Sequence, residues 1–265
     1  MRRRLDVELV RRGLARTRSE ARDLIARGGV TVGGRPATKA GTQVGPDEPV
    51  SLQAPGRRYA SRGGEKLSAA LDRFDIHVRG RRCLDVGAST GGFTDALLKA
   101  GAADVVAVDV GYGQLAWRLR IDPRVTVMDR TNARDLRTED LPFAPEVITA
   151  DLSFISLTKA VPALTAVAAA DAHLVLLVKP QFEAGREEVG RGGVVTDPAA
   201  WRRAIEDVAE ACNASGAGPQ AVTASPLRGP AGNVEFLLHA RAGRPGRALN
   251  VATAIAEGVS VREAS

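Results

Sequence analysis

Short apolar runs alternate with amphipathic segments from residue 63 to the end of the chain, whereas apolar positions are sparser before it. A helix is predicted over residues 65–74, because Leu67, Ala70 and Leu71 recur on one face. Seven apolar runs of strand length follow, most of them separated by helical patterns: residues 82–86, 104–109, 125–128, 147–150, 174–178, 220–224 and 234–239. Strands that alternate with helices predict an α/β fold with a doubly wound, partly parallel sheet.

The first quarter of the chain predicts a small α+β unit. Apolar residues at helical spacing predict one helix that stops at Gly13 and a second over residues 20–27, with Ser19 as its N-cap. Short extended pieces at 30–32 and 50–52 flank the turn signal Gly33-Gly34. Residues 53–62 are polar and contain Pro and Gly, as is typical of a linker. We therefore expect a small domain over 1–56, a linker over 57–62 and an α/β domain over 63–265.

Charge is distributed unevenly between these parts. The formal net charge is +6, yet residues 1–62 carry fourteen Lys and Arg against six Asp and Glu, a net of +8, and the remainder carries −2. A segregated basic segment is typical of a surface that binds a polyanion, most often nucleic acid. A hydrophobic fraction of 44% and a charged fraction of 26% are ordinary for globular proteins and argue against disordered and fibrous classes.

Composition also indicates the cellular compartment in which the protein works. Two cysteines, Cys83 and Cys212, cannot form a disulfide framework, and neither has a partner at metal-ligand spacing. The basic N-terminal segment lacks the apolar core and cleavage site of a signal peptide, and no run of eighteen apolar residues occurs. These features predict a soluble, cytoplasmic protein with neither a metal nor a membrane partner.

A glycine-rich turn between a strand and a helix is the first candidate site. The run LDVGASTGGFTD has the spacing GxxxGG and lacks the GxGxxG of dinucleotide sites. Acids at three successive strand ends, Asp85, Asp109 and Asp129, favour a nucleoside-like ligand and resemble the arrangement of S-adenosylmethionine-dependent methyltransferases. There Asp109 would bond the ribose diol and Asp129 the adenine amino group. The predicted cofactor residues are Asp85, Gly87, Ala88, Ser89, Gly91, Gly92, Phe93, Asp109 and Asp129.

Lysines and acids next to apolar runs are the catalytic candidates. Lys66 begins a predicted helix, Asp151 and Lys179 each follow a predicted strand, and Glu235 lies within one. Charges beside buried strands must be paired or functional. Methyl transfer to a ribose hydroxyl needs a group that orients the hydroxyl or takes its proton, and an amine beside a carboxylate can do so. The residues alone do not decide which lysine is the base.

The N-terminal run LVRRGLARTRSEARDLIARGGVTVGGRPA resembles the alpha-L RNA-binding domain of small-subunit ribosomal protein S-four. The resemblance implies contact with structured RNA through shape and phosphates. The arginines expected to bind RNA are Arg4, Arg11, Arg12, Arg16, Arg18, Arg22 and Arg27.

A second resemblance covers nearly the whole chain. The motifs SRGGEKL, LDVGASTGGFTD, VDVGYGQLAW, ADLSFISL, LVKPQFE and GPAGNVEF are similar to those of the TlyA (haemolysin-A-like) rRNA methyltransferases, of the FtsJ/RrmJ type. The resemblance implies a Rossmann-like S-adenosylmethionine-dependent sheet that methylates ribose 2′-hydroxyls of ribosomal RNA, at cytidines in the small subunit, the large subunit or both. Its Lys-Asp-Lys-Glu tetrad falls on Lys66, Asp151, Lys179 and Glu235, and implies that Lys179 activates the hydroxyl while Asp151 orients it.

Some positions depart from that pattern or have a structural interpretation. Arg57-Arg58-Tyr59-Ala60 replaces an Arg-x-Trp-Val linker of some relatives, which leaves a domain-coupling role open. We expect Tyr112 and Trp117 to pack beside the cofactor strand, and His173 and His239 to be structural. The loop that contains Arg186, Arg191, Gly192 and Gly193 is interpreted either as a substrate lid or as a plain connection.

Two other classes of function remain as alternatives. The haemolysin name suggests a cytolysin, for which the chain lacks a long basic amphipathic helix with an aromatic face. A non-catalytic RNA-binding factor would have lost the tetrad or the glycine turn, and both are present.

Overall fold

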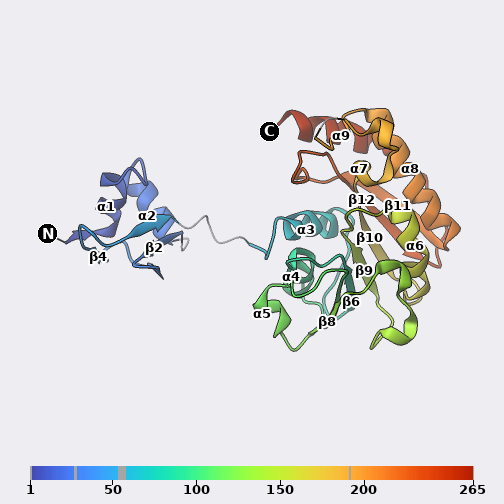
Figure 1. Ribbon diagram of the computed structural model, residues 1–265, viewed down its shortest axis with the longest axis horizontal. Helices are drawn as coiled ribbons and strands as arrows, with labels where there is room; N and C mark the ends of the chain where they lie inside the picture. Colours follow the sequence, from blue (N-terminus) through green and yellow to red (C-terminus); the bar gives the residue numbers. More distant parts are fainter. Residues whose placement is uncertain (1, 27–28, 53–57, 191, 265) are drawn as a thin grey trace. The chain divides into compact units, whose positions relative to one another are not determined.

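The computed structural model describes residues 2–26, 29–52, 58–190 and 192–264. Contacts divide the chain into two units, Met1–Arg58 and Tyr59–Ser265 (Figure 1). The expected positions 53–57 of the linker, and Arg27 and Arg191, lie outside the described residues.

The N-terminal unit is α+β, as its pattern predicts. Two helices, α1 (Leu5–Arg11) and α2 (Arg18–Ala26), pack on each other through buried Leu5, Leu9 and Ile25. The extended pieces form a sheet of order β3-β2-β5 and a two-stranded pair β1-β4. Their bounds are β1 (Arg3–Arg4), β2 (Val30–Val32), β3 (Arg35–Pro36), β4 (Gln43–Val44) and β5 (Val50–Leu52).

The predicted N-cap of α2 is wrong. The helix begins at Arg18, so Ser19 lies within it. The Thr17 hydroxyl accepts a hydrogen bond from the backbone N–H of Glu20 at 3.2 Å. Both positions carry a hydroxyl that can cap a helix, and the sequence does not show at which one the backbone leaves the helical conformation.

The second unit is an α/β fold. Its described strands are β6 (Arg82–Val86), β7 (Asp104–Asp109), β8 (Val125–Asp129), β9 (Val147–Ala150), β10 (His173–Val178), β11 (Ala217–Ala224) and β12 (Phe236–Ala242). Its helices are α3 (Gly63–Arg73), α4 (Gly92–Lys99), α5 (Trp117–Arg120), α6 (Leu157–Ala166), α7 (Pro180–Glu183), α8 (Pro198–Ala214) and α9 (Val251–Glu263), with short 3₁₀ turns η1 (Ala133–Asp135), η2 (Thr138–Asp140) and η3 (Arg186–Glu188). All seven predicted strands are present, with ends shifted by up to three residues.

The strands form one mixed sheet in the order β11-β12-β10-β9-β6-β7-β8 (Figure 1). Strands β8, β7, β6, β9 and β10 run parallel, whereas β12 is antiparallel to both β10 and β11. The order reverses between β6 and β9, which is where ligands of open α/β sheets bind.

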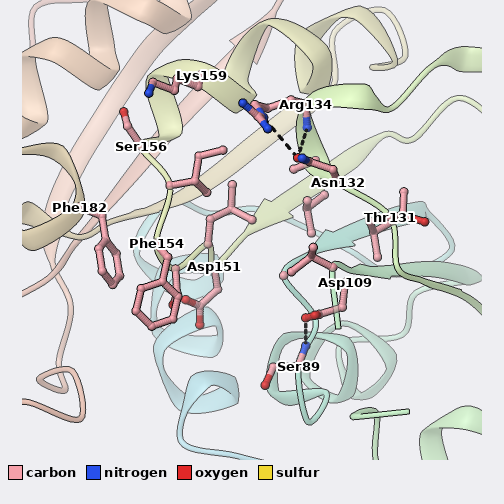
Figure 2. Close-up of a pocket in the computed structure, with 18 of the residues that line it drawn as sticks. Ser89, Asp109, Thr131, Asn132, Arg134, Asp151, Phe154, Ser156, Lys159 and Phe182 are labelled. Carbon is pink, nitrogen blue, oxygen red and sulfur yellow. Dashed lines mark hydrogen bonds between the residues drawn. The ribbon is translucent and has the colours of Figure 1, made fainter. Parts of the chain in front are cut away.

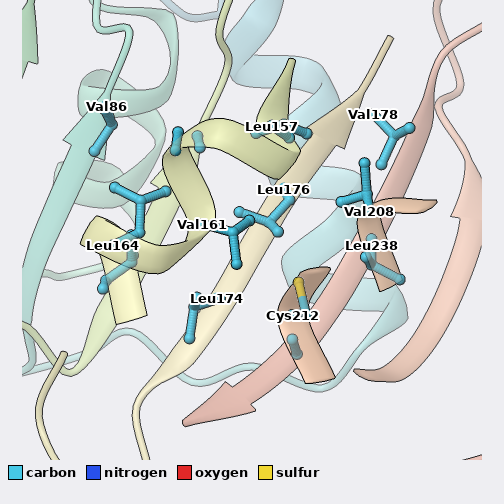
Figure 3. Close-up of a cluster of buried hydrophobic side chains, with 14 of the residues drawn as sticks. Val86, Leu157, Val161, Leu164, Leu174, Leu176, Val178, Val208, Cys212 and Leu238 are labelled. Carbon is cyan, nitrogen blue, oxygen red and sulfur yellow. The ribbon is translucent and has the colours of Figure 1, made fainter. Parts of the chain in front are cut away.

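Each face of the sheet is covered by helices. In β10, Leu174, Leu176 and Val178 pack with α6 and α8, whereas Val175 and Leu177 belong to the cluster with α3 and α4. Figure 3 shows the first cluster, in which Val161 and Leu164 of α6 lie beside β10. A strand that is buried on both faces is mostly apolar. The sequence of β10 is therefore a continuous apolar run from Leu174 to Val178.

Three boundaries differ from expectation. Glu235 lies one residue before β12 rather than within a strand, and α3 begins at Gly63, two residues before its predicted start. Tyr59, expected in the linker, is buried in the second unit, and the backbone N–H of Ala60 donates to Asp95 Oδ2 at 2.8 Å. Among the described residues, no helix is both long and apolar enough to cross a membrane.

Candidate active site

A cavity of about 930 Å³ lies at the carboxyl ends of the parallel strands. Its walls come from the segments that leave β6, β7, β8, β9 and β10. Figure 2 shows Ser89 and Asp109 on one side and Asp151, Phe154 and Phe182 on another. The volume is within the range of pockets that hold drug-sized ligands.

The glycine turn forms the wall next to β6. Gly87 has φ +84°, and a Cβ added there would meet the backbone oxygen of Asp151 at 2.4 Å. Gly91 has φ +94° and precedes α4, and a Cβ there would meet Leu119 Cδ1 at 2.3 Å. Both positions therefore require glycine, because the backbone is left-handed and closely approached. Of the predicted turn residues, Gly87 and Ser89 line the cavity, whereas Ala88, Gly91, Gly92 and Phe93 do not.

Asp109 holds the turn in shape. Its Oδ2 accepts from the backbone N–H of Ser89 at 2.7 Å and its Oδ1 from the N–H of Gly111 at 2.7 Å. The carboxylate also lines the cavity at the end of β7, where Figure 2 marks its bond to Ser89. An anionic acceptor in this wall suits a hydroxyl-bearing ligand such as a ribose.

Asp85 lies below the turn and not in the cavity wall. Its side chain is fully buried and accepts hydrogen bonds from the hydroxyls of Thr94 at 2.6 Å and Thr149 at 3.2 Å. Burial raises the pKa of Asp85 to about 7, and the hydroxyl hydrogen bonds only partly offset this effect. The geometry therefore makes Asp85 a positioning residue, which joins α4 and β9 beneath the turn.

Asp129 is also outside the cavity wall. It ends β8, pairs with Arg120 at 2.9 Å and accepts from the backbone N–H of Gly113 at 3.3 Å. The residues that follow it line the cavity instead: Thr131, Asn132, Ala133 and Arg134. Sequence reasoning missed these residues, although the motif RTNAR directly after an apolar strand was a visible signal.

The four tetrad residues form two ion pairs, of which Lys66–Glu235 is buried and Lys179–Asp151 is partly exposed. Lys179 Nζ lies 2.6 Å from Asp151 Oδ1 and donates to Ser153 Oγ at 2.9 Å. Lys66 Nζ pairs with Glu235 Oε2. Burial raises the pKa of Glu235, although Lys66 and Lys179 act in the opposite direction. The two ion pairs therefore lie close enough for their charges to act on each other. Asp151 also lines the cavity.

Sheet topology explains why these distant residues meet. Asp151 and Lys179 directly follow the neighbouring parallel strands β9 and β10. Val178 is opposite Phe236 in the antiparallel pair β10-β12, so Glu235 enters β12 at the edge where Lys179 leaves β10. Lys66 reaches the same edge from α3.

Aromatic residues at the cavity were missed or misjudged. Phe154 has φ +65° and is 92% exposed, with its ring 5.3 Å from that of Phe182. Tyr112 and Trp117 were expected to pack beside the cofactor strand, but they are 67% and 73% exposed. Apolar content alone does not separate a buried aromatic side chain from one at the surface.

His173 and His239 are partners of each other. His173 Nδ1 lies 3.0 Å from His239 Nε2 across β10 and β12, and the rings stack. Burial lowers the pKa of both to about 4, so both rings are neutral near pH 7. Neither residue lines the cavity, in agreement with a structural role.

The glycine-rich loop after Lys179 is tied to the segment before Glu235. Asn233 Nδ2 donates to the backbone oxygen of Gly193 at 2.8 Å, and Asn233 Oδ1 accepts from the N–H of Val195 at 2.9 Å. Whether the loop moves as a lid stays open.

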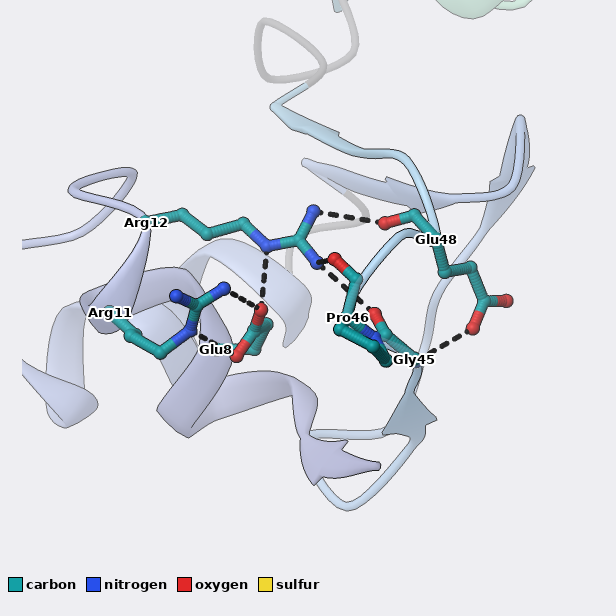
Figure 4. Close-up of polar contacts among 6 residues, drawn as sticks. All are labelled: Glu8, Arg11, Arg12, Gly45, Pro46 and Glu48. Carbon is teal, nitrogen blue, oxygen red and sulfur yellow. Dashed lines mark hydrogen bonds and ion pairs between the residues drawn. The ribbon is translucent and has the colours of Figure 1, made fainter. Parts of the chain in front are cut away.

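The arginines of the N-terminal unit surround two buried carboxylates. Asp6 accepts hydrogen bonds from Arg4, Arg18 and Arg22, and Glu8 from Arg11 and Arg12. Arg12 also donates to three backbone oxygens, of Gly45, Pro46 and Glu48 (Figure 4).

These contacts set the ionisation of both acids. Burial would raise the pKa of Asp6, but the three arginines outweigh burial and hold it well below its usual range. The Arg11 and Arg12 hydrogen bonds lower the pKa of Glu8 to about 2. Five of the seven predicted RNA-binding arginines thus also hold the fold together, Arg16 is an exposed candidate, and Arg27 is not described.

No cluster of His, Cys, Asp or Glu that could hold a metal ion occurs among the residues described. Cys83 and Cys212 are buried thiols in separate core clusters, and burial raises the pKa of each to about 12.

Comparison with known proteins relates both units to established families. Residues 59–242 match the FtsJ-like methyltransferase family, and residues 3–50 match the S4 domain. The chain is 53% identical over 239 residues, 90% of its length and 89% of the relative's, to the 16S/23S rRNA (cytidine-2'-O)-methyltransferase TlyA of Mycobacterium tuberculosis. It is 39% identical over 237 residues, 89% of its length and 98% of the relative's, to Hemolysin A of Brachyspira hyodysenteriae.

A solved structure gives the same result. The fold is similar to that of a Streptococcus thermophilus protein that carries a hemolysin label, with a TM-score of 0.76 and 35% identity, over 99% of this chain and 98% of the other. The chain therefore belongs to the FtsJ-like methyltransferase family, in its TlyA group, with an S4 domain at its N-terminal end.

Proposed function

We propose that this protein transfers a methyl group from S-adenosylmethionine to the ribose 2′-hydroxyl of cytidines in ribosomal RNA. The observation that carries the proposal is the Lys179–Asp151 pair, 2.6 Å apart, beside a cavity whose opposite wall is a glycine turn held by Asp109. The cavity thus has room for a nucleoside. Beside it lie a carboxylate that can orient a hydroxyl and an amine that can take its proton.

The cofactor fits the wall formed by β6 and β7. Asp109 presents a carboxylate for the ribose hydroxyls, and the turn at Gly87 leaves no space for a side chain between it and Asp151. The segment Thr131–Arg134 would lie against the adenine, with Asp129 behind it. When bound, S-adenosylmethionine supplies a methyl group on a sulfonium, which is an electrophile.

The four tetrad residues orient the 2′-hydroxyl and remove its proton. Asp151 would accept a hydrogen bond from the 2′-hydroxyl and orient its lone pair towards the methyl carbon. Lys179 Nζ, in the form of the neutral amine, would take the proton as the oxygen–carbon bond forms. The turn at Gly87 and Asp109 would hold the cofactor, which would supply the methyl carbon and keep the electron pair of its carbon–sulfur bond. Asp151, the partner of Lys179, lines the cavity, whereas Lys66 and its partner Glu235 do not, so we assign Lys179 as the base.

The RNA substrate follows from both units. The relative of Mycobacterium tuberculosis is named for 16S and 23S rRNA cytidines. Residues 1–62, which include the S4 domain, carry a net charge of +8, and this provides an affinity for phosphates that the net −2 of residues 63–265 does not.

The decisive test is Lys179→Ala. We expect at least a 100-fold loss of methyl transfer to ribosomes from a strain that lacks this gene, measured with tritiated cofactor, because general-base assistance of this kind is worth about 10²–10⁴-fold. Calorimetric cofactor binding and rRNA binding should stay within a few-fold of the unmodified protein. Lys99→Ala, which removes a lysine bonded to Asp95 outside the cavity, is the matched control and should retain activity. Full activity of Lys179→Ala would refute the mechanism.

A further inference from the structure

One residue that lines the cavity, Gln181, has a buried polar atom without a partner. Gln181 Oε1 is buried and makes no hydrogen bond with any described residue. The other two such atoms among the described residues, Arg120 Nη1 and Thr165 Oγ1, belong to side chains that do not line the cavity. A buried acceptor without a donor costs free energy, so an unpaired one at a binding site needs a donor from a ligand group or an ordered water.

Gln181 lies on the side of the cavity where the acceptor nucleotide must sit. It is in α7, two residues after Lys179, and lines the same cavity as Asp151. The residues assigned to the cofactor, Ser89 and Asp109, lie on a different side of the cavity from Asp151 and Phe182 (Figure 2). The base and the 2′-oxygen of a nucleotide are attached to adjacent ribose carbons. A 2′-hydroxyl held at Lys179 and Asp151 therefore brings its base to the neighbouring wall.

The chemistry of the orphaned atom selects among bases. An amide oxygen only accepts hydrogen bonds. Cytosine carries an amino donor at N4, whereas uracil carries an acceptor at O4 that would face Oε1 with no proton between them. A site built to bond a donor rejects an analogue that lacks it far more strongly than an apolar pocket does.

We propose that Gln181 is a specificity-determining residue whose side-chain oxygen accepts a hydrogen bond from the exocyclic amino group of the target base, so that cytidine is methylated in preference to uridine. This inference rests on the proposed function and deepens it.

The test compares two substrates and three variants. The substrates are ribosomal subunits from a strain that lacks this gene, with the mapped target cytidine either kept or replaced by uridine. Single-turnover methylation at saturating cofactor should favour cytidine by about 10-fold or more in the unmodified protein, the effect of one unpaired buried group. Gln181→Met should bring this ratio close to one while cytidine is still methylated, and Gln181→Glu, which keeps an acceptor, should retain the preference.

A second glutamine provides the matched control. Gln114 lines the cofactor side of the cavity and its Oε1 lies 3.3 Å from Ser89 Oγ. Gln114→Met should weaken cofactor binding measured by calorimetry and leave the cytidine-to-uridine ratio unchanged.

The outcomes separate this inference from the proposed function. Retention of the full cytidine preference by Gln181→Met would overturn the inference, as would weakened cofactor binding without a change of ratio, which would assign the amide to the cofactor. Loss of methylation on both substrates with cofactor binding intact would also overturn it. If the unmodified protein methylated neither substrate, the proposed function itself would fail.

Discussion

Single residues in this protein show how one charge can serve both folding and recognition. Arg12 is 20% exposed, pairs with the buried Glu8 and donates to three backbone oxygens of the segment Gly45–Glu48. Arg16 is exposed, and no described carboxylate lies within ion-pair distance of its side chain. A substitution of either arginine removes one positive charge, but only the first removes contacts that hold the N-terminal unit.

We therefore expect the two arginines to differ when each is replaced by alanine. Arg16→Ala should weaken rRNA binding a few-fold and reduce the salt slope by about one, with unchanged amide exchange. Arg12→Ala should speed amide exchange in residues 43–50, because backbone oxygens and a buried carboxylate lose their donor. Hydrogen-exchange mass spectrometry and filter binding of the full chain measure both effects. Unchanged exchange in Arg12→Ala would make that arginine an RNA contact only.

At the scale of elements, the strand–turn–helix from β6 to α4 depends on backbone shape. Gly87 and Gly80 both have positive φ, at +84° and +74°. A Cβ at Gly87 would overlap the backbone of Asp151, whereas nothing lies within 4 Å of one at Gly80. A comparison of the two positions therefore separates the free-energy cost of a left-handed backbone from the cost of a clash with the backbone of Asp151.

Alanine at these two glycines tests the interpretation. Gly80→Ala should cost about 1 kcal/mol of stability from the left-handed conformation alone. Gly87→Ala should lower the melting temperature further and weaken cofactor binding by at least 10-fold, since the turn must move away from Asp151. Thermal unfolding and calorimetry measure the two quantities. Equal effects of both substitutions would show that the close approach at Gly87 has no role in binding.

At the scale of the whole molecule, the uneven charge assigns different tasks to the two units. Ion pairs within the N-terminal unit leave its net charge unchanged, because each pair was already counted with both signs. The +8 of residues 1–62, against −2 for the remainder, therefore still acts on a polyanion over a Debye length of about 10 Å.

Removal of the N-terminal unit should separate RNA binding from cofactor binding. A fragment of residues 59–265 keeps Tyr59, which is buried, and Ala60, which bonds Asp95. We expect it to bind S-adenosylmethionine with near-native affinity and to lose most rRNA affinity and salt dependence. Calorimetry and filter binding at several salt concentrations test this. Near-native methylation of ribosomes by the fragment would contradict the division of labour.

The seven strands and the principal helices could be predicted because burial on both faces of a sheet requires apolar runs, and helical coverage requires amphipathic segments. The prediction was wrong where two residues could serve as the N-cap of the same helix, as Thr17 and Ser19 could at the start of α2. Other errors concern solvent exposure, because the sequence does not show that the side chains of Trp117 and Phe154 are exposed.

The sequence by itself determined the fold class, the glycine turn and the identity of the four tetrad residues, because local patterns and motif spacing carry that information. Only the tertiary structure decided which of them pair. The parallel and antiparallel order of β9, β10 and β12 brings Lys179 to Asp151 and Glu235 to Lys66. It also separated cavity-lining Asp109 from supporting Asp85 and left Gln181 Oε1 without a partner. Such contacts depend on strand order and packing across long stretches of sequence, which no local pattern records.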